Sequence, residues 1–242
     1  MYNEKVILAR VEGIRERIAA ACDRSGRALS EIQIVAVTKT HPVEALVAAW
    51  HAGIRNFGEN RVQDAAPKFA LIPTVLPEAR KNGLRLHMIG HLQTNKAKTA
   101  LDVFDLIHSV DSLKLASELE KQATKKRLSA PILIQVNISG EESKSGIAPD
   151  AVDPLVEHIL GVCPHLVIEG YMTMAPFVDD SEIVRPCFHR LREIRDKMAS
   201  LYSGEERYRG LELSMGMTND YEIAVEEGAT LVRIGTAIFG MR

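Results

Sequence analysis

The chain has 242 residues, 46% of them apolar and 26% charged, which are the proportions of an ordinary globular protein. Its 30 basic and 32 acidic residues give a formal net charge of −2 without a long block of one sign, which argues against a nucleic-acid-binding or membrane-surface protein. No apolar run reaches the roughly 18 residues that span a bilayer, and the acids within the first apolar stretch argue against a signal peptide.

The first predicted element is an amphipathic helix over about residues 3–22, with Ile7, Val11, Ile14 and Ile18 on one face. After it, short runs of Val, Ile, Leu and Met alternate with segments of helical spacing. Because these runs are nearly continuous in apolar residues, they indicate parallel strands that are buried on both faces. The expected strands are Ile34–Lys39, Ile54–Gly58, Leu84–Gly90, Asp105–Val110, Ile132–Asn137, Val167–Met172, Leu211–Gly216 and Leu231–Thr236.

Helices are predicted between these strands. One is opened by Pro42 and closed by Gly53, and a long amphipathic helix covers Val184–Leu201. Asp111 and Asn219 are expected to cap two further helices, because their side chains can accept hydrogen bonds from the first free N–H groups.

Eight strand–helix alternations predict a (β/α)₈ TIM-type barrel with an extra N-terminal helix, as a single domain over 1–242 whose barrel covers about 32–240. A doubly wound open sheet is the alternative. In such a barrel the chemistry lies where the strands end, because the loops there converge on the barrel mouth. The predicted strand ends are rich in glycine and polar residues, so the mouth is the expected site.

Lys39 follows a buried apolar run at the point where the strand reaches the mouth. Burial lowers the pKa of an amine because it disfavours the charged form, and a neutral lysine condenses with an aldehyde to form a Schiff base. We therefore expect a partly desolvated, aldehyde-binding lysine. A solvated lysine at a strand end is the plainer alternative.

The loops after the seventh and eighth predicted strands combine small residues with hydrogen-bond donors. Gly216 lets the backbone approach a ligand, Ser214 and Thr218 add hydroxyl groups, and Gly235 with Thr236 forms a second small turn. Phosphate sites in these barrels are frequently built from the same two loops. The pattern therefore indicates a phosphate monoester site, with two ordinary tight turns as the alternative.

Arg233 lies within an apolar strand, where an unpaired guanidinium would be costly. It is expected either to form a salt bridge with a neighbouring strand or to contact a ligand. A reactive lysine, a phosphate site and an arginine between them together suggest pyridoxal 5′-phosphate (PLP) as the ligand, with Arg233 facing the pyridine ring.

Several ordered motifs carry a family resemblance over about residues 34–240: AVTKTHP, NFGENRVQ, HMIGHLQTNK, IHSVDS, QVNISGEESKSG and LSMGMTNDYEIAVEEGATLVRIGTAIFG. In these motifs the chain closely resembles the YggS-type pyridoxal phosphate homeostasis proteins. The resemblance implies a barrel of the alanine-racemase type, monomeric or weakly associating, that binds PLP without established turnover. It also implies the PLP-binding residues, which are Lys39 for the Schiff base, Asn60 in the pocket wall, Ser214, Gly216, Met217, Thr218, Gly235 and Thr236 for the phosphate, and Arg233 at the ring.

The expected function is that of a non-catalytic protein of vitamin B6 homeostasis, which holds PLP on Lys39, limits free aldehyde and passes PLP to apo-enzymes. An arginine beside the pyridine nitrogen keeps it unprotonated and weakens the ring as an electron sink. Racemases add a catalytic tyrosine from a second domain, and the chain ends six residues after Thr236, so we expect no such domain and no catalytic residue. A one-base, lysine-dependent PLP racemase is the first alternative, and a Schiff-base aldolase acting on a sugar phosphate is the second.

Three weaker signals remain. Lys144 places a second lysine near the mouth, where a solvated loop is expected and a transient contact with the aldehyde is the alternative. His87 and His91 lack a third ligand at suitable spacing, so no metal site is expected. The cysteines are widely spaced and odd in number, which is typical of buried, reduced thiols in a cytoplasmic protein. They are Cys22, Cys163 and Cys187.

Overall fold

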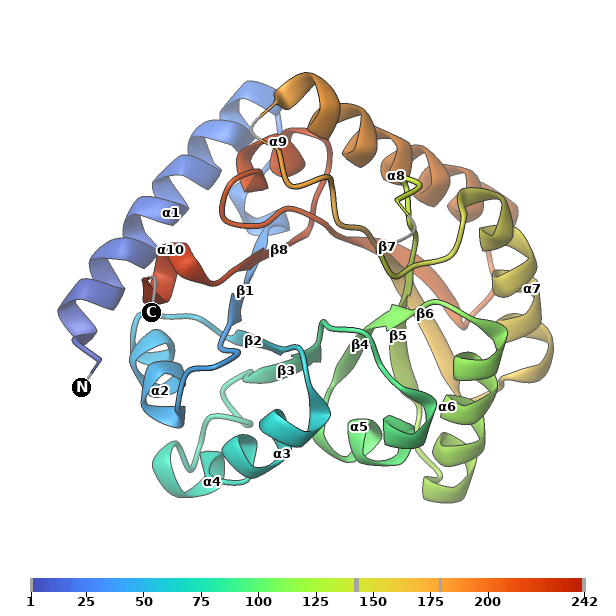
Figure 1. The fold of residues 1–242 in the computed structure, drawn as a ribbon, viewed down its shortest axis with the longest axis horizontal. Coiled ribbons are helices and arrows are strands. Elements are labelled where there is room, and N and C mark those ends of the chain that lie inside the picture. The colour runs from blue at the N-terminus through green and yellow to red at the C-terminus, as the bar shows by residue number, and fades with distance from the viewer. Residues whose placement is uncertain (1, 142–143, 179, 241–242) are drawn as a thin grey trace.

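The computed structural model describes residues 2–141, 144–178 and 180–240, and in it the parallel strands close into a barrel (Figure 1). Each strand pairs with the next in the chain, and β8 returns to pair with β1. The closed sheet confirms the predicted barrel and excludes the open doubly wound sheet. The strands are β1 (Gln33–Val37), β2 (Asn56–Glu59), β3 (Arg85–Met88), β4 (Leu106–Val110), β5 (Ala130–Gln135), β6 (Leu166–Met172), β7 (Tyr208–Ser214) and β8 (Leu231–Ile234).

The helices surround this barrel, and α1 lies outside the ring against α2, α9 and α10 (Figure 1). The four isoleucine and valine residues expected on one face of α1 are all buried there, so the N-terminal helix is confirmed. The helices are α1 (Glu4–Ser25), α2 (Val43–His51), α3 (Val62–Phe69), α4 (Ile72–Val75), α5 (Ala97–Val103), α6 (Leu113–Lys126), α7 (Val152–Val162), α8 (Ser181–Leu201), α9 (Tyr221–Glu226) and α10 (Thr236–Phe239).

Two predicted helix caps are wrong by one residue. Ser112, and not Asp111, caps α6, because its hydroxyl accepts from the amide of Leu115. At α9 the N-cap position is taken by Asp220 and not by Asn219. In both places two adjacent residues are good caps by type, so the pattern alone could not separate them.

The barrel interior contains its own apolar cluster, separate from the larger core between strands and helices. It is formed by Val35, Val37, Ile89, Leu106, Leu133, Met172 and Leu231. Because side chains alternate along a strand, Val35 and Val37 of β1 both point into the interior. Within the part of the chain that the structure describes, no helix is long and apolar enough to cross a membrane.

Candidate functional site

Lys39 lies in a tight turn directly after β1, and not within the strand as expected. The amide of Thr38 still bonds to the carbonyl of Gly58 at 3.0 Å, and the amide of His41 closes the turn on the carbonyl of Thr38, also at 3.0 Å. Thr40 has a φ of +65°, which is unusual and strained for a β-branched residue. Lys39 is exposed, so the expectation of a partly desolvated amine is wrong for this structure.

The turn that carries Lys39 forms one wall of a pocket of about 280 Å³. The opposite wall is the loop after β8, so the structure brings Lys39 together with Gly235 and Thr236. A Cβ atom added to Gly235 would lie 3.4 Å from Val37, which is an ordinary contact. Gly235 therefore supplies a small, close-lying backbone rather than an obligatory conformation.

A buried ion pair supports the turn from below. Lys68 on α3 lies 2.5 Å from Glu59 Oε1, and Glu59 is only 1% exposed. Lys68 Nζ also donates to the carbonyl of Thr38 at 2.8 Å, while the Thr38 hydroxyl donates to Glu59 at 2.7 Å. The residue before Lys39 is therefore held by both its side chain and its carbonyl.

The loop after β7 needs a glycine at position 216. Gly216 has a φ of +89°, and an added Cβ would lie 2.6 Å from the Cβ of Ala224 on α9. The Met217 amide donates to Asp220 Oδ1 at 2.5 Å, so it is already engaged within the loop. Burial raises the pKa of Asp220, and the hydrogen bond from Met217 and the charge of Arg233 oppose this rise.

Two threonine hydroxyl groups lie at the predicted phosphate loops. Thr236 is exposed and Thr218 is partly exposed. Among the described residues, neither hydroxyl takes part in a hydrogen bond. Both are therefore available to an anionic ligand at the mouth.

Arg233 is 4% exposed and bridges two strand ends from inside the barrel. Its Nη1 donates to Ser214 Oγ at 2.7 Å, and its Nη2 donates to the carbonyl of Thr173 at 2.9 Å. Burial lowers the pKa of Arg233 to about 10, and the charge of Asp220 opposes this effect. Among the described residues, the side chain thus makes no salt bridge to a neighbouring strand, and two of its nitrogens donate to Ser214 at the end of β7 and to Thr173 just after β6.

Ser214 is fully buried, and hydrogen bonds connect it to Arg233 on one side and to two interior histidines on the other. His108 Nδ1 lies 2.8 Å from Ser214 Oγ, and His108 Nε2 lies 2.8 Å from His87 Nδ1. His87 Nε2 then lies 3.1 Å from Asn56 Oδ1. Burial lowers the pKa of His87 to about 3 and that of His108 well below its ordinary value, so both rings are neutral.

Asn60 lies in a neighbouring pocket of about 430 Å³, beyond the ends of β2 and β3. Its backbone passes over Gly90, where an added Cβ would lie 2.3 Å from the Asn60 carbonyl oxygen. His91 lines the same pocket, with Nδ1 3.3 Å from a carboxylate oxygen of Asp111. The structure therefore does not bring Asn60 into the pocket that contains Lys39.

The remaining sequence signals are resolved as local contacts. Lys144 pairs with Glu141 at 2.6 Å, while Glu142 and Ser143 of the same loop lie outside the described residues. Within the described ranges, no three His, Cys, Asp or Glu side chains are grouped so that they could hold a metal ion. The three cysteines are free and buried.

Sequence reasoning missed four polar residues of this region: Lys68, His108, Gln135 and Asp220. Gln135 ends β5, donates to the carbonyl of Ser145 at 2.9 Å, and leaves its Oε1 buried without a partner. A signal existed for His108, which alternates with the interior residue Leu106 on β4 and so had to face the interior. Nothing in the pattern shows that Lys68 reaches back to β1.

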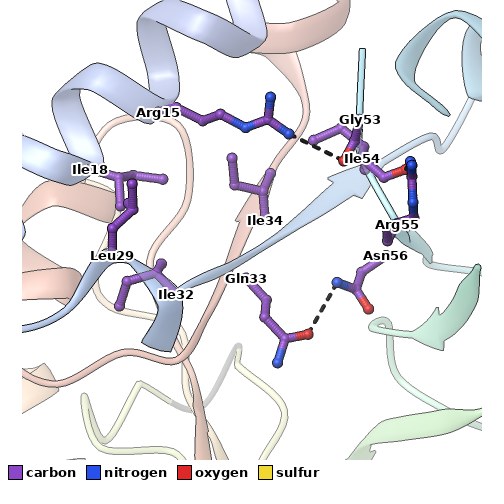
Figure 2. Close-up of a pocket in the computed structure, with 10 residues that line it drawn as sticks. All are labelled: Arg15, Ile18, Leu29, Ile32, Gln33, Ile34, Gly53, Ile54, Arg55 and Asn56. Atoms are coloured by element: carbon purple, nitrogen blue, oxygen red, sulfur yellow. Dashed lines mark hydrogen bonds between the residues drawn. The ribbon is translucent and has the colours of Figure 1, made fainter. Parts of the chain in front are cut away.

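A third pocket, of about 340 Å³, lies at the opposite end of the barrel between α1 and the first residues of β1 and β2 (Figure 2). There Arg15 donates to the carbonyl of Gly53 at 3.1 Å. Figure 2 also shows the hydrogen bond from Asn56 Nδ2 to Gln33 Oε1, which measures 3.2 Å. Lys39 and the two predicted phosphate loops lie at the other end, so this pocket is not part of the candidate site.

Comparison with known proteins gives a consistent result. The family model for the N-terminal domain of alanine racemase matches residues 12–242. A pyridoxal phosphate homeostasis protein of Aquifex aeolicus is 41% identical over 234 residues, covering 96% of this chain and 97% of that protein. A protein of the same description from Escherichia coli K12 is 40% identical over 232 residues, covering 95% and 94%.

Solved structures agree with this. PipY of Synechococcus elongatus with PLP bound matches with a TM-score of 0.77 at 37% identity, covering 94% of this chain and 100% of that one. An alanine racemase from Corynebacterium glutamicum matches with a TM-score of 0.70 at 12% identity, covering 99% of this chain and 62% of that one. The racemase therefore shares the barrel fold.

Proposed function

The chain belongs to the pyridoxal phosphate homeostasis proteins of the alanine racemase N-terminal domain family, and we propose that it binds PLP as a Schiff base on Lys39. It would then buffer PLP or supply it to apo-enzymes without turning over an amino acid. The observation that carries this proposal is the pocket in which the Lys39 turn faces Gly235 and Thr236. PLP itself supplies an aldehyde that condenses with an amine, and a pyridine ring that withdraws electrons.

The exposure of Lys39 supports a carrier. The Nζ atom attacks the PLP aldehyde carbon, a C=N bond replaces C=O, and water leaves. Because Lys39 is exposed, water can return to the same carbon and release the aldehyde. A lysine sealed inside the barrel would instead favour retention of the ligand.

The donor set fits a phosphate monoester without a cluster of lysines. The hydroxyl groups of Thr218 and Thr236 are available, and the small residues Gly216 and Gly235 allow close approach of the backbone. The Met217 amide is engaged by Asp220, so we propose that this residue contributes by shaping the loop. We propose that Asn60 contacts the ligand from the pocket beyond β2 and β3, as a wall residue.

Arg233 supports binding without turnover. A guanidinium donates hydrogen bonds and does not accept them, so it favours an unprotonated pyridine nitrogen. An unprotonated ring is a weaker electron sink, which disfavours loss of the Cα proton of a bound amino acid. We therefore propose that Ser214 serves the site through Arg233, to which its hydroxyl is bonded.

The test is transfer. Protein loaded with PLP and freed of excess ligand is mixed with an apo-form of a PLP-dependent enzyme, and the recovery of that enzyme's activity is followed. We expect recovery with the loaded wild-type protein and none with Lys39→Ala treated in the same way. Equal recovery with both proteins would contradict the proposal, and so would steady racemisation of amino acids above the rate given by free PLP. Sedimentation at working concentration checks the expected monomer.

A further inference from the structure

A chain of hydrogen bonds crosses the barrel interior from the mouth to the opposite end. It begins at Arg233, passes through Ser214, His108 and His87, and reaches Asn56. Asn56 Nδ2 in turn donates to Gln33 at the pocket shown in Figure 2. The proposed binding of PLP on Lys39 uses neither of the two histidines.

The direction of this hydrogen-bond chain follows from its far end. Asn56 Nδ2 donates to Gln33, so Asn56 Oδ1 faces His87 and accepts from its Nε2–H. A neutral His87 then has an unprotonated Nδ1, which accepts from His108 Nε2–H.

The same reasoning continues to the mouth. A neutral His108 with its proton on Nε2 has an unprotonated Nδ1, so the Ser214 hydroxyl donates to it and the Ser214 oxygen accepts from Arg233. Every bond from Arg233 to Gln33 therefore runs in one direction.

A proton added to either ring would break this arrangement. A second N–H on His87 would face the N–H of His108 across 2.8 Å, and a second N–H on His108 would turn the Ser214 hydroxyl proton away from the ring and reverse that hydrogen bond. The charged groups that act on the pair, Arg233 on His108 and Arg85 on His87, are both cationic and oppose a further positive charge. The guanidinium is thus the only cation in this chain of hydrogen bonds.

We propose that His108 and His87 are positioning residues of the PLP site. As two neutral rings whose hydrogen bonds run in one direction, they orient the Ser214 hydroxyl so that its oxygen accepts from Arg233. The Arg233 guanidinium is thereby held in place to donate to the ligand. This inference rests on the proposed function. It explains why a serine and two histidines are buried next to Arg233 in the barrel interior. Apolar side chains would fill the same space without leaving buried polar groups that need hydrogen-bond partners.

The first test uses the wild-type chain and needs no bound ligand. Nitrogen-15 NMR of histidine-labelled protein should show both rings protonated on Nε2 alone, with no titration between about pH 5 and pH 8. A scalar coupling between His108 Nε2 and His87 Nδ1 should be visible across their hydrogen bond. Titration of either ring in this range, or a proton on Nδ1, would overturn the inference.

The second test separates positioning from packing. In His108→Gln the side-chain Oε1 can accept from Ser214 and the Nε2 can donate to His87, so the direction of the chain is kept. In His108→Leu it is broken. We expect PLP affinity to fall about tenfold in His108→Leu and to stay within about twofold of wild type in His108→Gln. Ile107→Ala, next to His108 but in the outer core, is the matched control for lost packing.

The outcomes distinguish this inference from the proposed function. Wild-type protein that takes up no PLP would overturn the proposed function and with it the role at the ligand, while the NMR result would still decide the direction of the chain. Wild-type protein that binds PLP, with a folded His108→Leu that binds it equally well, would overturn this inference alone. So would equal losses in His108→Leu, His108→Gln and Ile107→Ala. If His108→Leu does not fold, loss of binding in a folded His108→Gln whose His87 is still protonated on Nε2 alone would also overturn it.

Discussion

Arg233 and Ser214 are joined by a 2.7 Å hydrogen bond between neighbouring strands β8 and β7, the two strands whose following loops are expected to hold the ligand phosphate. The backbone adds a second link, because the Arg233 amide donates to the Gly216 carbonyl at 3.0 Å. The ring side and the phosphate side of the proposed site are therefore fixed to each other.

Arg233→Lys tests the geometry of this link. The substitution keeps the charge, but a lysine ammonium cannot reproduce the planar fork that reaches both Ser214 and the Thr173 carbonyl. We expect a loss of about 1–3 kcal/mol in the free energy of unfolding, measured with urea. Arg209→Lys, at an exposed arginine paired with Glu169, is the control and should change little. Equal stability of Arg233→Lys and wild type would show that the fork is dispensable.

Gly216→Ala and Gly235→Ala form a matched pair in the two loops. At position 216 the added Cβ meets Ala224 at 2.6 Å on a backbone with a φ of +89°, so we expect a loss of about 2 kcal/mol or more. At position 235 the nearest atoms lie at 3.4 Å, so we expect a change below about 1 kcal/mol. Thermal unfolding of the two variants decides between them, and the reverse order would contradict the loop geometry.

Lys68→Met tests the support beneath Lys39. The variant leaves the Glu59 carboxylate buried without its cation, which should cost about 3–5 kcal/mol of unfolding free energy. The double variant Glu59→Gln with Lys68→Met has no unpaired charge, so it should regain part of that loss. If the losses of unfolding free energy in Glu59→Gln and Lys68→Met simply add in the double variant, the two residues are not coupled, which would contradict the prediction.

The buried histidines predict an acid-sensitive fold. Burial lowers the pKa of both rings in the folded protein, to about 3 for His87, whereas the unfolded chain takes up protons below the ordinary value of 6.5. The free energy of unfolding is therefore unaffected by these two histidines above pH 6.5. It decreases as the pH falls from 6.5 towards 3, by about 1.4 kcal/mol per histidine per pH unit. The double variant His87→Gln with His108→Gln should lose stability less steeply than wild type below pH 6.5. Parallel curves from urea unfolding at several pH values would contradict the buried, neutral pair.

The barrel could be predicted because its signals are local and repeated. Each strand is a short apolar run, and the pattern of Ile7, Val11, Ile14 and Ile18 marks α1 unambiguously. The mouth could be predicted as well, because polar residues at the ends of parallel strands must meet. The exact strand ends could not be predicted, since Thr38 continues the ladder of β1 by a single hydrogen bond while Lys39 does not.

The interior contacts could not be predicted in the same way. Lys68 reaches Glu59 and Thr38 from a helix about nine and thirty positions away, and no sequence period reports that contact. His87 and His108 were each visible as residues, but their pairing depends on the register between β3 and β4. The Met217 amide donates to Asp220, because a short acidic side chain within the loop accepts hydrogen bonds from nearby free N–H groups.

The measurement that tests the central claim most directly is borohydride reduction of the PLP-treated protein, followed by peptide mass spectrometry, with Lys39→Ala and Lys144→Ala treated in parallel. Reduction converts a Schiff base into a stable secondary amine, so it marks the lysine that held the aldehyde. We expect a single stoichiometric pyridoxyl modification on Lys39 in wild type and in Lys144→Ala, and its loss in Lys39→Ala. Stoichiometric modification of any other lysine, or an unmodified wild-type protein under conditions of excess PLP, would contradict the account.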